Sequence, residues 1–348
     1  MSPLAIIWIT ALVLIALALG WMSGLIVLRL INERRAGRLA ADRRAVVEGL
    51  SALLRDVPDA IDALRPYAHR ARLMADVLVE FQGLIRGADQ ERVLSQLREI
   101  GLVDVLVARL ERGSRAGRLT VLEALSALGG ETARQAMRRA IGSPRPEIRM
   151  AAVKALADNG NPPSIGRLLD YAVGGELEPS RLYAELLRQV AAADPAAAMK
   201  ALERADHSPQ LRALTLDALG FSGDYQVVPL LIVFAGHAHF EVRTAAVRAL
   251  GRLQHPAGEG AIGRAMEDES WTVRSAAAEA AGAAGFSRLA AGLDRLLGDA
   301  EWWVRFRAGE ALFALGVEGR AVLRLAAGSE RPLAHRAAEL ALAEGDAT

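Results

Sequence analysis

The sequence predicts an all-α protein in which an α-solenoid of stacked helical hairpins follows one transmembrane helix. Three observations lead to this prediction. The chain begins with a long run without charge, an arginine recurs every 31 residues towards the C-terminus, and no stretch alternates apolar and polar residues as a strand does. The composition agrees, because aromatic residues make up only 5% of a chain that is 52% hydrophobic and rich in alanine.

Length and charge set the first limits on function. The 348 residues leave room for about two domains or one elongated array. Lys and Arg number 42 against 41 for Asp and Glu, and this balance gives no reason to expect a nucleic acid partner. The absence of cysteine excludes disulfides, thiol nucleophiles and cysteine-ligated zinc.

Residues 1–30 are predicted to form a membrane anchor. Residues 3–28 carry no charge, and a membrane-spanning helix needs only ~20 apolar residues. No basic residue precedes this run, which is about twice the length of a signal-peptide core, so a retained anchor is favoured over a cleaved signal. Ala16, Gly20 and Gly24 share one face at four-residue spacing. They are candidates for helix packing, as a homodimer or against another membrane protein, although chance spacing of small residues gives the same pattern.

The residues after the apolar run predict its orientation. Arg29, Arg34, Arg35 and Arg38 follow the run, and no basic residue precedes it. The positive-inside rule therefore places the N-terminus on the outer side of the inner (cytoplasmic) membrane and everything after the anchor in the cytoplasm. The same arginines are candidates for contact with anionic headgroups.

Residues 31–111 are predicted to be a juxtamembrane and N-terminal helical segment. One helix is expected over 38–56, where Pro58 breaks the pattern. A second long helix is expected to begin at Asp59 and end at Gly87, and Asp89 is placed to cap a third.

Residues 112–348 are predicted to form repeats. Each repeat places an arginine at the same position, followed six residues later by alanine and seven later by leucine in most units. These arginines are Arg118, Arg149, Arg181, Arg212, Arg243, Arg274, Arg305 and Arg336, of which the last five are 31 residues apart. Gly220, Gly251 and Gly282 are interpreted as helix-ending glycines. A shorter second helix is expected in each unit, as over 226–235 and 257–266. One such hairpin cannot bury its own apolar face, so the units must stack.

The segments HFEVRTAAVRALGRL, SWTVRSAAAEAAGAAG and EWWVRFRAGEALFALG resemble HEAT-type repeats, specifically the short class also found in phycobilin-lyase proteins. The resemblance implies a solenoid whose concave face holds another protein. It also implies a ladder between neighbouring repeats, made by an aspartate six residues before the repeat arginine. Asp206 and Arg212, Asp268 and Arg274, and Asp299 and Arg305 fit this spacing, and Glu330 with Arg336 is a conservative variant. The ladder is expected to fail where another residue replaces the aspartate, at His237, Ser143, Gly175 and Arg112.

Two further rows follow the repeat. Five residues after the arginine lie charged residues of alternating sign, which we interpret either as a partner-binding groove or as a solvated polar face: Lys154, Asp217, Arg248, Glu279 and Glu310. The alternation argues against nucleic acid. Three residues before the arginine lie Phe240, Trp271 and Trp302, interpreted mainly as packing residues between neighbouring repeats, with an exposed binding edge as the alternative. Trp303 is expected to face outwards and to join the groove.

The sequence offers no catalytic motif of the nucleotide-binding, metalloprotease or serine-hydrolase type, so no enzymatic activity and no cofactor are expected. His207, with Asp206, lies one repeat before His237 and His239, in turns that stacking would bring together. These turns could hold a metal or could simply carry helix-capping side chains, and the sequence leaves both alternatives open.

These observations favour a membrane-anchored cytoplasmic scaffold that binds another protein, as an accessory subunit of a membrane enzyme or transporter. Similar bacterial proteins are associated with envelope-polysaccharide glycosyltransferases, and this resemblance names one partner class. The alternative is a bilin-lyase-like or chaperone-like protein that handles a tetrapyrrole or its apoprotein.

Overall fold

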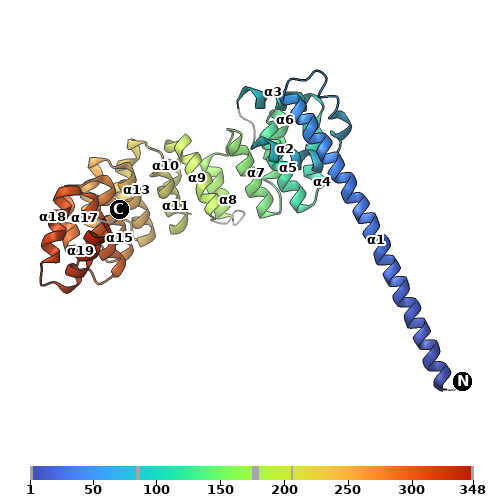
Figure 1. Ribbon diagram of the computed structural model, residues 1–348. Coiled ribbons are helices and arrows are strands. Elements are labelled where there is room, and N and C mark those ends of the chain that lie inside the picture. The colour runs from blue at the N-terminus through green and yellow to red at the C-terminus, as the bar shows by residue number, and fades with distance from the viewer. Residues whose placement is uncertain (1–2, 84–86, 175–179, 205–206, 346–348) are drawn as a thin grey trace. The chain divides into compact units, whose positions relative to one another are not determined.

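The computed structural model of the chain describes residues 3–83, 87–174, 180–204 and 207–345, and the side chains of residues 3–16, 18, 19 and 82 are outside this description. All regular structure in these residues is helical (Figure 1). The chain divides into two compact units, Met1–Gly142 and Ser143–Thr348. The prediction of an all-α protein built from many helices is confirmed.

In its described residues the first unit has six α-helices and a 3₁₀ turn at Arg65–Tyr67; the α-helices are α1 Pro3–Leu54, α2 Ala71–Gln82, α3 Ala88–Glu99, α4 Leu102–Arg112, α5 Arg115–Leu128 and α6 Glu131–Ala140. The C-terminal part of α1 buries Val46 and Leu50 in the core of this unit. The expected helix from Asp59 to Gly87 is wrong. Asp59 adopts a left-handed φ of 58°, whereas an N-cap residue is extended, so the chain runs through turns until α2 begins at Ala71.

The N-terminal half of α1 covers the predicted anchor. The described residues of this half, 17 and 20–41, are exposed. Within the part of the chain that the structure describes, no helix combines the length and the apolar character needed to cross a membrane. The side chains of most of the apolar run, Ala16 included, lie outside the described residues. Gly20 and Gly24 have open space around them. The anchor therefore stays a prediction.

The second unit contains α7 to α19. Odd-numbered helices carry the repeat arginine near their start, and even-numbered ones are the shorter second helices. The odd helices are α7 Pro146–Asp158, α9 Arg181–Ala193, α11 Pro209–Leu219, α13 Phe240–Leu253, α15 Trp271–Ala284, α17 Trp302–Ala314 and α19 Pro332–Gly345. The even helices are α8 Ile165–Val173, α10 Pro195–Leu202, α12 Val228–Phe234, α14 Glu259–Ala265, α16 Ala290–Leu296 and α18 Gly316–Ala327. Single 3₁₀ turns lead into α12, α14 and α16.

Within this unit each odd helix packs against the next odd helix, most closely in the pairs α11–α13, α13–α15 and α15–α17. Alanines and leucines at the repeated positions form the shared core. Ala249, Leu250, Ala280, Ala311 and Leu312 are almost completely buried. The predicted solenoid of stacked hairpins is the observed arrangement of this unit.

The interpretation of Gly220, Gly251 and Gly282 as helix-ending glycines is confirmed at one position and wrong at two. Gly220 follows the last residue of α11, with right-handed dihedrals, whereas Gly251 and Gly282 lie inside α13 and α15. A Cβ placed on Gly251 would lie 2.6 Å from the Cβ of Ala280, and one on Gly282 would lie 2.8 Å from that of Ala311. The glycines thus let neighbouring odd helices approach closely. The left-handed helix ends are instead Gln254 and Gly285.

Candidate functional site

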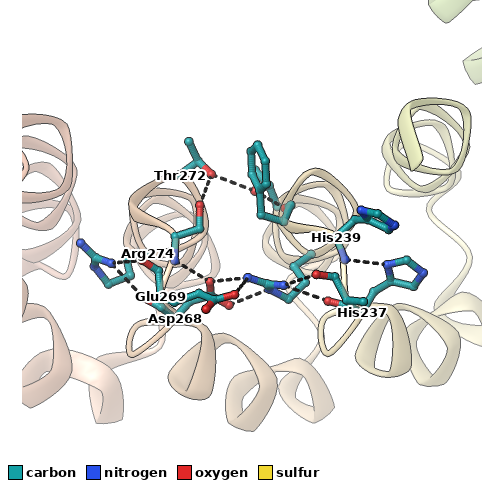
Figure 2. A network of polar contacts seen from close by, with 11 residues as sticks. His237, His239, Asp268, Glu269, Thr272 and Arg274 are labelled. Atoms are coloured by element: carbon teal, nitrogen blue, oxygen red, sulfur yellow. Dashed lines mark hydrogen bonds and ion pairs between the residues drawn. The ribbon is translucent and has the colours of Figure 1, made fainter. Parts of the chain in front are cut away.

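The repeat arginines link neighbouring repeats. Nη1 of Arg243 donates to the carbonyl oxygens of His237 and Ala238, both at 3.0 Å. Its Nε and Nη2 donate to the two carboxylate oxygens of Asp268 at 2.8 and 2.7 Å. This guanidinium therefore closes the turn before its own helix, at His237, and also binds the turn before α15, at Asp268 (Figure 2).

Arg274 repeats this geometry one repeat later. It donates to both oxygens of Asp299 at 2.7 and 3.0 Å and to the carbonyl oxygen of Asp268 at 2.8 Å. The aspartates also hold their own turns, because Asp268 accepts from the backbone N–H of Ser270 and Asp299 from that of Glu301, both at 2.9 Å. Asp268 thus serves both the arginine before it and the turn after it.

The ladder pairs are largely buried, with exposed side-chain fractions of 9% for Arg243 and 13% for Asp268. The Asp268 carboxylate raises the pKa of Arg243, chiefly through the paired hydrogen bonds. At Asp299 burial acts to raise the carboxyl pKa, but the hydrogen bonds from Arg274 and Glu301 and the charges of Arg274 and Arg305 lower it overall. Arg243 and Asp299 therefore carry their charges at neutral pH.

The ladder is interrupted at His237. The Nδ1 atom of His237 accepts from the N–H of His239 at 3.1 Å, so the imidazole takes over the turn-holding role of the aspartate but offers Arg212 no carboxylate. Arg212 donates to the backbone carbonyl oxygens of Leu202, Arg204 and His207 instead. Asp206, the expected partner in this turn, lies outside the described residues.

Two of the three histidines form a stacked group. The rings of His237 and His239 stack at 5.6 Å between centroids, and Phe234 stacks on His237 at 5.9 Å. Burial, followed by the charges of Arg212, His239 and Arg243, lowers the pKa of His237. His207 is 4% exposed. Among the residues that the structure describes, no three His, Asp or Glu side chains are placed to hold a metal.

The charged row lies on the odd helices of the second unit. Lys154, Arg248, Glu279 and Glu310 are exposed, and Asp217 is half-buried. Lys154 pairs with Asp158 on its own helix and Glu310 with Arg307. In the described part of the chain, Arg248 and Glu279 form no ion pair. The row is therefore a surface of mixed charge. The side chains of Arg248 and Glu279, at its centre, are available to a partner.

Asp217 belongs to a cluster that the sequence did not indicate. Arg252 pairs with it at 2.7 Å and Arg188 at 3.4 Å. Both guanidiniums also lie over the ring of Phe221, at 4.3 and 4.8 Å from its centroid. Phe221 remains 50% exposed. The two arginines come from α13 and α9, at different repeat positions, so the period alone gives no signal for their meeting.

The aromatic row is not buried, contrary to the favoured interpretation. Phe240, Trp271 and Trp302 are 44%, 41% and 47% exposed, and Trp303 is 52% exposed. In the described residues no ring contact joins one repeat to the next in this row. Trp302 instead stacks on Phe306 of its own helix at 5.0 Å and meets Trp303 edge-on at 4.7 Å.

A pocket of about 250 Å³ lies between α17 and α19. Its apolar wall begins at the Trp302–Phe306 stack and continues along the side chains of α19. The lining residues are Trp302, Arg305, Phe306 and Glu310 on α17, and Leu333, Arg336, Ala337, Leu340, Ala341 and Glu344 on α19. One residue of the predicted groove row, Glu310, and one ladder arginine, Arg305, thus meet in the same pocket.

Comparison with known proteins bears on the repeat type. Residues 103–181 and 195–262, less than half of the chain, match the family described as HEAT repeats. A comparison with curated proteins finds no match.

Among solved structures, yeast importin-β (Kap95p) is 14% identical, with a TM-score of 0.46 over 85% of this chain and 50% of that one. The complex of CpcE and CpcF of phycocyanin lyase from Nostoc sp. PCC7120 is 20% identical, with a TM-score of 0.29 over 72% and 92%. Human deoxyhypusine hydroxylase is 16% identical, with a TM-score of 0.25 over 71% and 96%.

Proposed function

We propose that this chain is a non-catalytic scaffold that binds another protein along the odd helices of its HEAT-repeat unit. The observation that carries the proposal is the side-by-side packing of α13, α15 and α17, which exposes one charged position on three successive odd helices, at Arg248, Glu279 and Glu310. HEAT repeats in general mediate contacts between proteins. A row of mixed charge fits the polar part of a protein interface and would repel the backbone of a nucleic acid at its acidic positions.

The proposal includes a membrane anchor. Its support is the uncharged run over residues 3–28, followed by Arg29, Arg34, Arg35 and Arg38. Such a run is long enough to cross the hydrocarbon core, and the arginines favour a cytoplasmic position for the repeats. The partner class that follows is a membrane enzyme or transporter, for example an envelope-polysaccharide glycosyltransferase.

Tethering gives this arrangement its mechanism. Two proteins confined to one membrane meet at a high effective concentration, so a modest affinity of the charged row suffices for a stable complex. Contacts of α1 with the partner's transmembrane helices through Gly20 and Gly24 would add a second binding site.

The test is purification of the full-length chain from its native membranes in mild detergent, with mass spectrometry of the proteins that accompany it. The row is altered by combining Arg248→Glu with Glu279→Lys, two exposed positions that form no ion pair within the described structure. We expect one polytopic membrane protein at near-stoichiometric yield with the wild type and about tenfold less with the double variant.

Lys200→Glu is the matched control, because this exposed lysine lies on α10, one of the even helices. It should leave the yield unchanged. A wild-type chain that elutes alone, or a yield that the double variant leaves intact, contradicts the proposal.

A further inference from the structure

The pocket between α17 and α19 lies where α19 has smaller side chains than α17 at two positions of the repeat. At the position of Trp271 and Trp302 the next repeat has Leu333, and at the position of Phe306 it has Ala337. The groove between α17 and α19 therefore loses two rings that the preceding repeat supplies. The apolar space that results is bounded by the stacked Trp302 and Phe306.

The same pocket contains the last arginine fork of the ladder. Nη1 of Arg305 closes its own turn through the carbonyl oxygens of Asp299 and Ala300, at 2.7 and 2.8 Å. Its Nε and Nη2, the atoms that bind an aspartate in Arg243 and Arg274, meet no acceptor in the described residues. The position of that aspartate is occupied by Glu330, which is exposed and forms no ion pair in the same part of the chain.

The reason for this break lies in Pro332. Asp268 and Asp299 are held in place by the backbone N–H two residues further on. The residue two positions after Glu330 is Pro332, which has no N–H to donate. The turn before α19 therefore does not fix a carboxylate against Arg305, and the guanidinium edge stays open towards the pocket.

Two arginines of the pocket are available to a carboxylate. Arg305 and Arg336 both line it, and Arg336 is exposed without an ion pair in the described structure. Of the two acidic lining residues, Glu310 pairs with Arg307 at 2.8 Å, and Glu344 is exposed at the C-terminal end of α19 without an ion pair in the described residues. In the two preceding repeats, Nε and Nη2 of the arginine donate to an aspartate carboxylate, Asp268 for Arg243 and Asp299 for Arg274. A carboxylate is therefore the group that suits the same two nitrogens of Arg305.

From this geometry we infer that the α17–α19 pocket binds a partner segment in which an aspartate or glutamate stands next to a large apolar side chain. The carboxylate takes the place of the missing ladder aspartate on Arg305, with Arg336 beside it. The apolar side chain fills the space next to Trp302 and Phe306. This inference rests on the proposed scaffold function and names the feature of the partner that is recognised.

The test is selection of a random dodecapeptide phage library on the full-length chain in detergent micelles. Bound clones are eluted, and the peptides are synthesised and measured by fluorescence polarisation. We expect enrichment of an acidic residue adjacent to Phe, Trp or Leu, and about tenfold weaker binding when the acidic residue becomes Asn or Gln.

Arg336→Gln and Ala337→Phe probe the two halves of the pocket. Arg336→Gln removes an exposed cation, and Ala337→Phe fills the apolar space as Phe306 does one repeat earlier. Each should weaken the selected peptides about tenfold, whereas Arg324→Gln, which removes an exposed cation of α18 that does not line the pocket, should not. Far-UV circular dichroism checks that each variant remains folded.

Each other outcome overturns the inference: no enrichment over bare micelles, enriched peptides without an acidic residue, or peptides that bind both pocket variants normally. The proposed scaffold function is tested separately by co-purification. A partner that is retained by Arg336→Gln and Ala337→Phe but lost with the Arg248 and Glu279 double variant would contradict the pocket alone.

Discussion

Arg243 illustrates how a single residue combines two structural roles. Its Nη1 satisfies the carbonyl oxygens of its own turn, and its other nitrogens bind Asp268 of the next repeat. Because both side chains are nearly buried, neither charge can be left alone without a large cost. The pair therefore sets the register between α13 and α15 as well as contributing to stability.

Asp268→Ala should be strongly destabilising. It leaves the Arg243 guanidinium without its carboxylate and removes the acceptor for the Ser270 N–H, and breaking such a buried pair costs about 3 kcal/mol. Urea unfolding of the full chain, followed by circular dichroism, measures the change. Asp294→Ala is the control, because the Asp294–Arg331 pair is exposed and such pairs contribute at most ~1 kcal/mol. Equal effects of the two substitutions would contradict this account of the ladder.

His237 should make the fold sensitive to mild acid. Burial and nearby cations lower its pKa in the folded chain, so below the ordinary value of about 6.5 the unfolded chain binds a proton that the folded chain does not. Folding stability therefore falls as the pH falls from about 7 towards the lowered pKa. His237→Asp should remove this dependence and add about 1 kcal/mol at pH 7 by giving Arg212 a carboxylate. Urea midpoints of both proteins at pH 7.5 and 5.5 test this, and an unchanged pH dependence would refute it.

At the scale of elements, close approach of neighbouring helices depends on single glycines. Gly→Ala inside a helix normally stabilises by up to ~1 kcal/mol. At Gly251 the same substitution should lower the free energy of unfolding, because the new methyl group would lie 2.6 Å from the Cβ of Ala280 and force α13 and α15 apart. We expect a loss of about 1–3 kcal/mol.

Gly166→Ala provides the comparison, because Gly166 lies in α8 with no atom near the position of its Cβ. This substitution should leave stability unchanged or raise it. The measurement is the thermal unfolding midpoint of each variant, compared with that of the wild type. Destabilisation at both positions would show that the contact at Gly251 is not the cause.

Most of the helical repeat could be predicted from the sequence, since the arginine and the alanine–leucine pair recur at a constant period. The role of Gly251 could not, because a helix-ending glycine and a glycine of close approach look alike in one sequence. The cluster of Arg188, Asp217 and Arg252 was missed because its members occupy different positions of the repeat. The pocket did leave a signal that was overlooked, namely Leu333 where three earlier repeats carry a ring, and Ala337 where the preceding repeat carries Phe306.

At the scale of the whole molecule, a repeat array distributes stability over its interfaces, so a local weakness stays local. The ladder is interrupted before Arg243, where His237 stands, and after Arg305, where Glu330 and Pro332 stand. Between these points Arg243, Arg274 and their aspartates form a continuous polar seam through α13, α15 and the start of α17. The pocket lies immediately beyond the end of this seam. Its α17 wall is therefore attached to repeats that the ladder holds together.

The absence of cysteine allows a direct test of membrane topology. Ser2→Cys and Val317→Cys each introduce a single thiol, at the N-terminus and at a residue that is 80% exposed in α18. If residues 3–28 span the membrane with the following arginines inside, a membrane-impermeant maleimide should label Ser2→Cys in intact cells. It should label Val317→Cys only after the membrane is permeabilised. Labelling of Val317→Cys in intact cells would show that the repeats lie on the outer side of the membrane and would contradict the predicted orientation. Recovery of either variant in the soluble fraction would refute the anchor and leave the HEAT repeats to bind their partner without a tether.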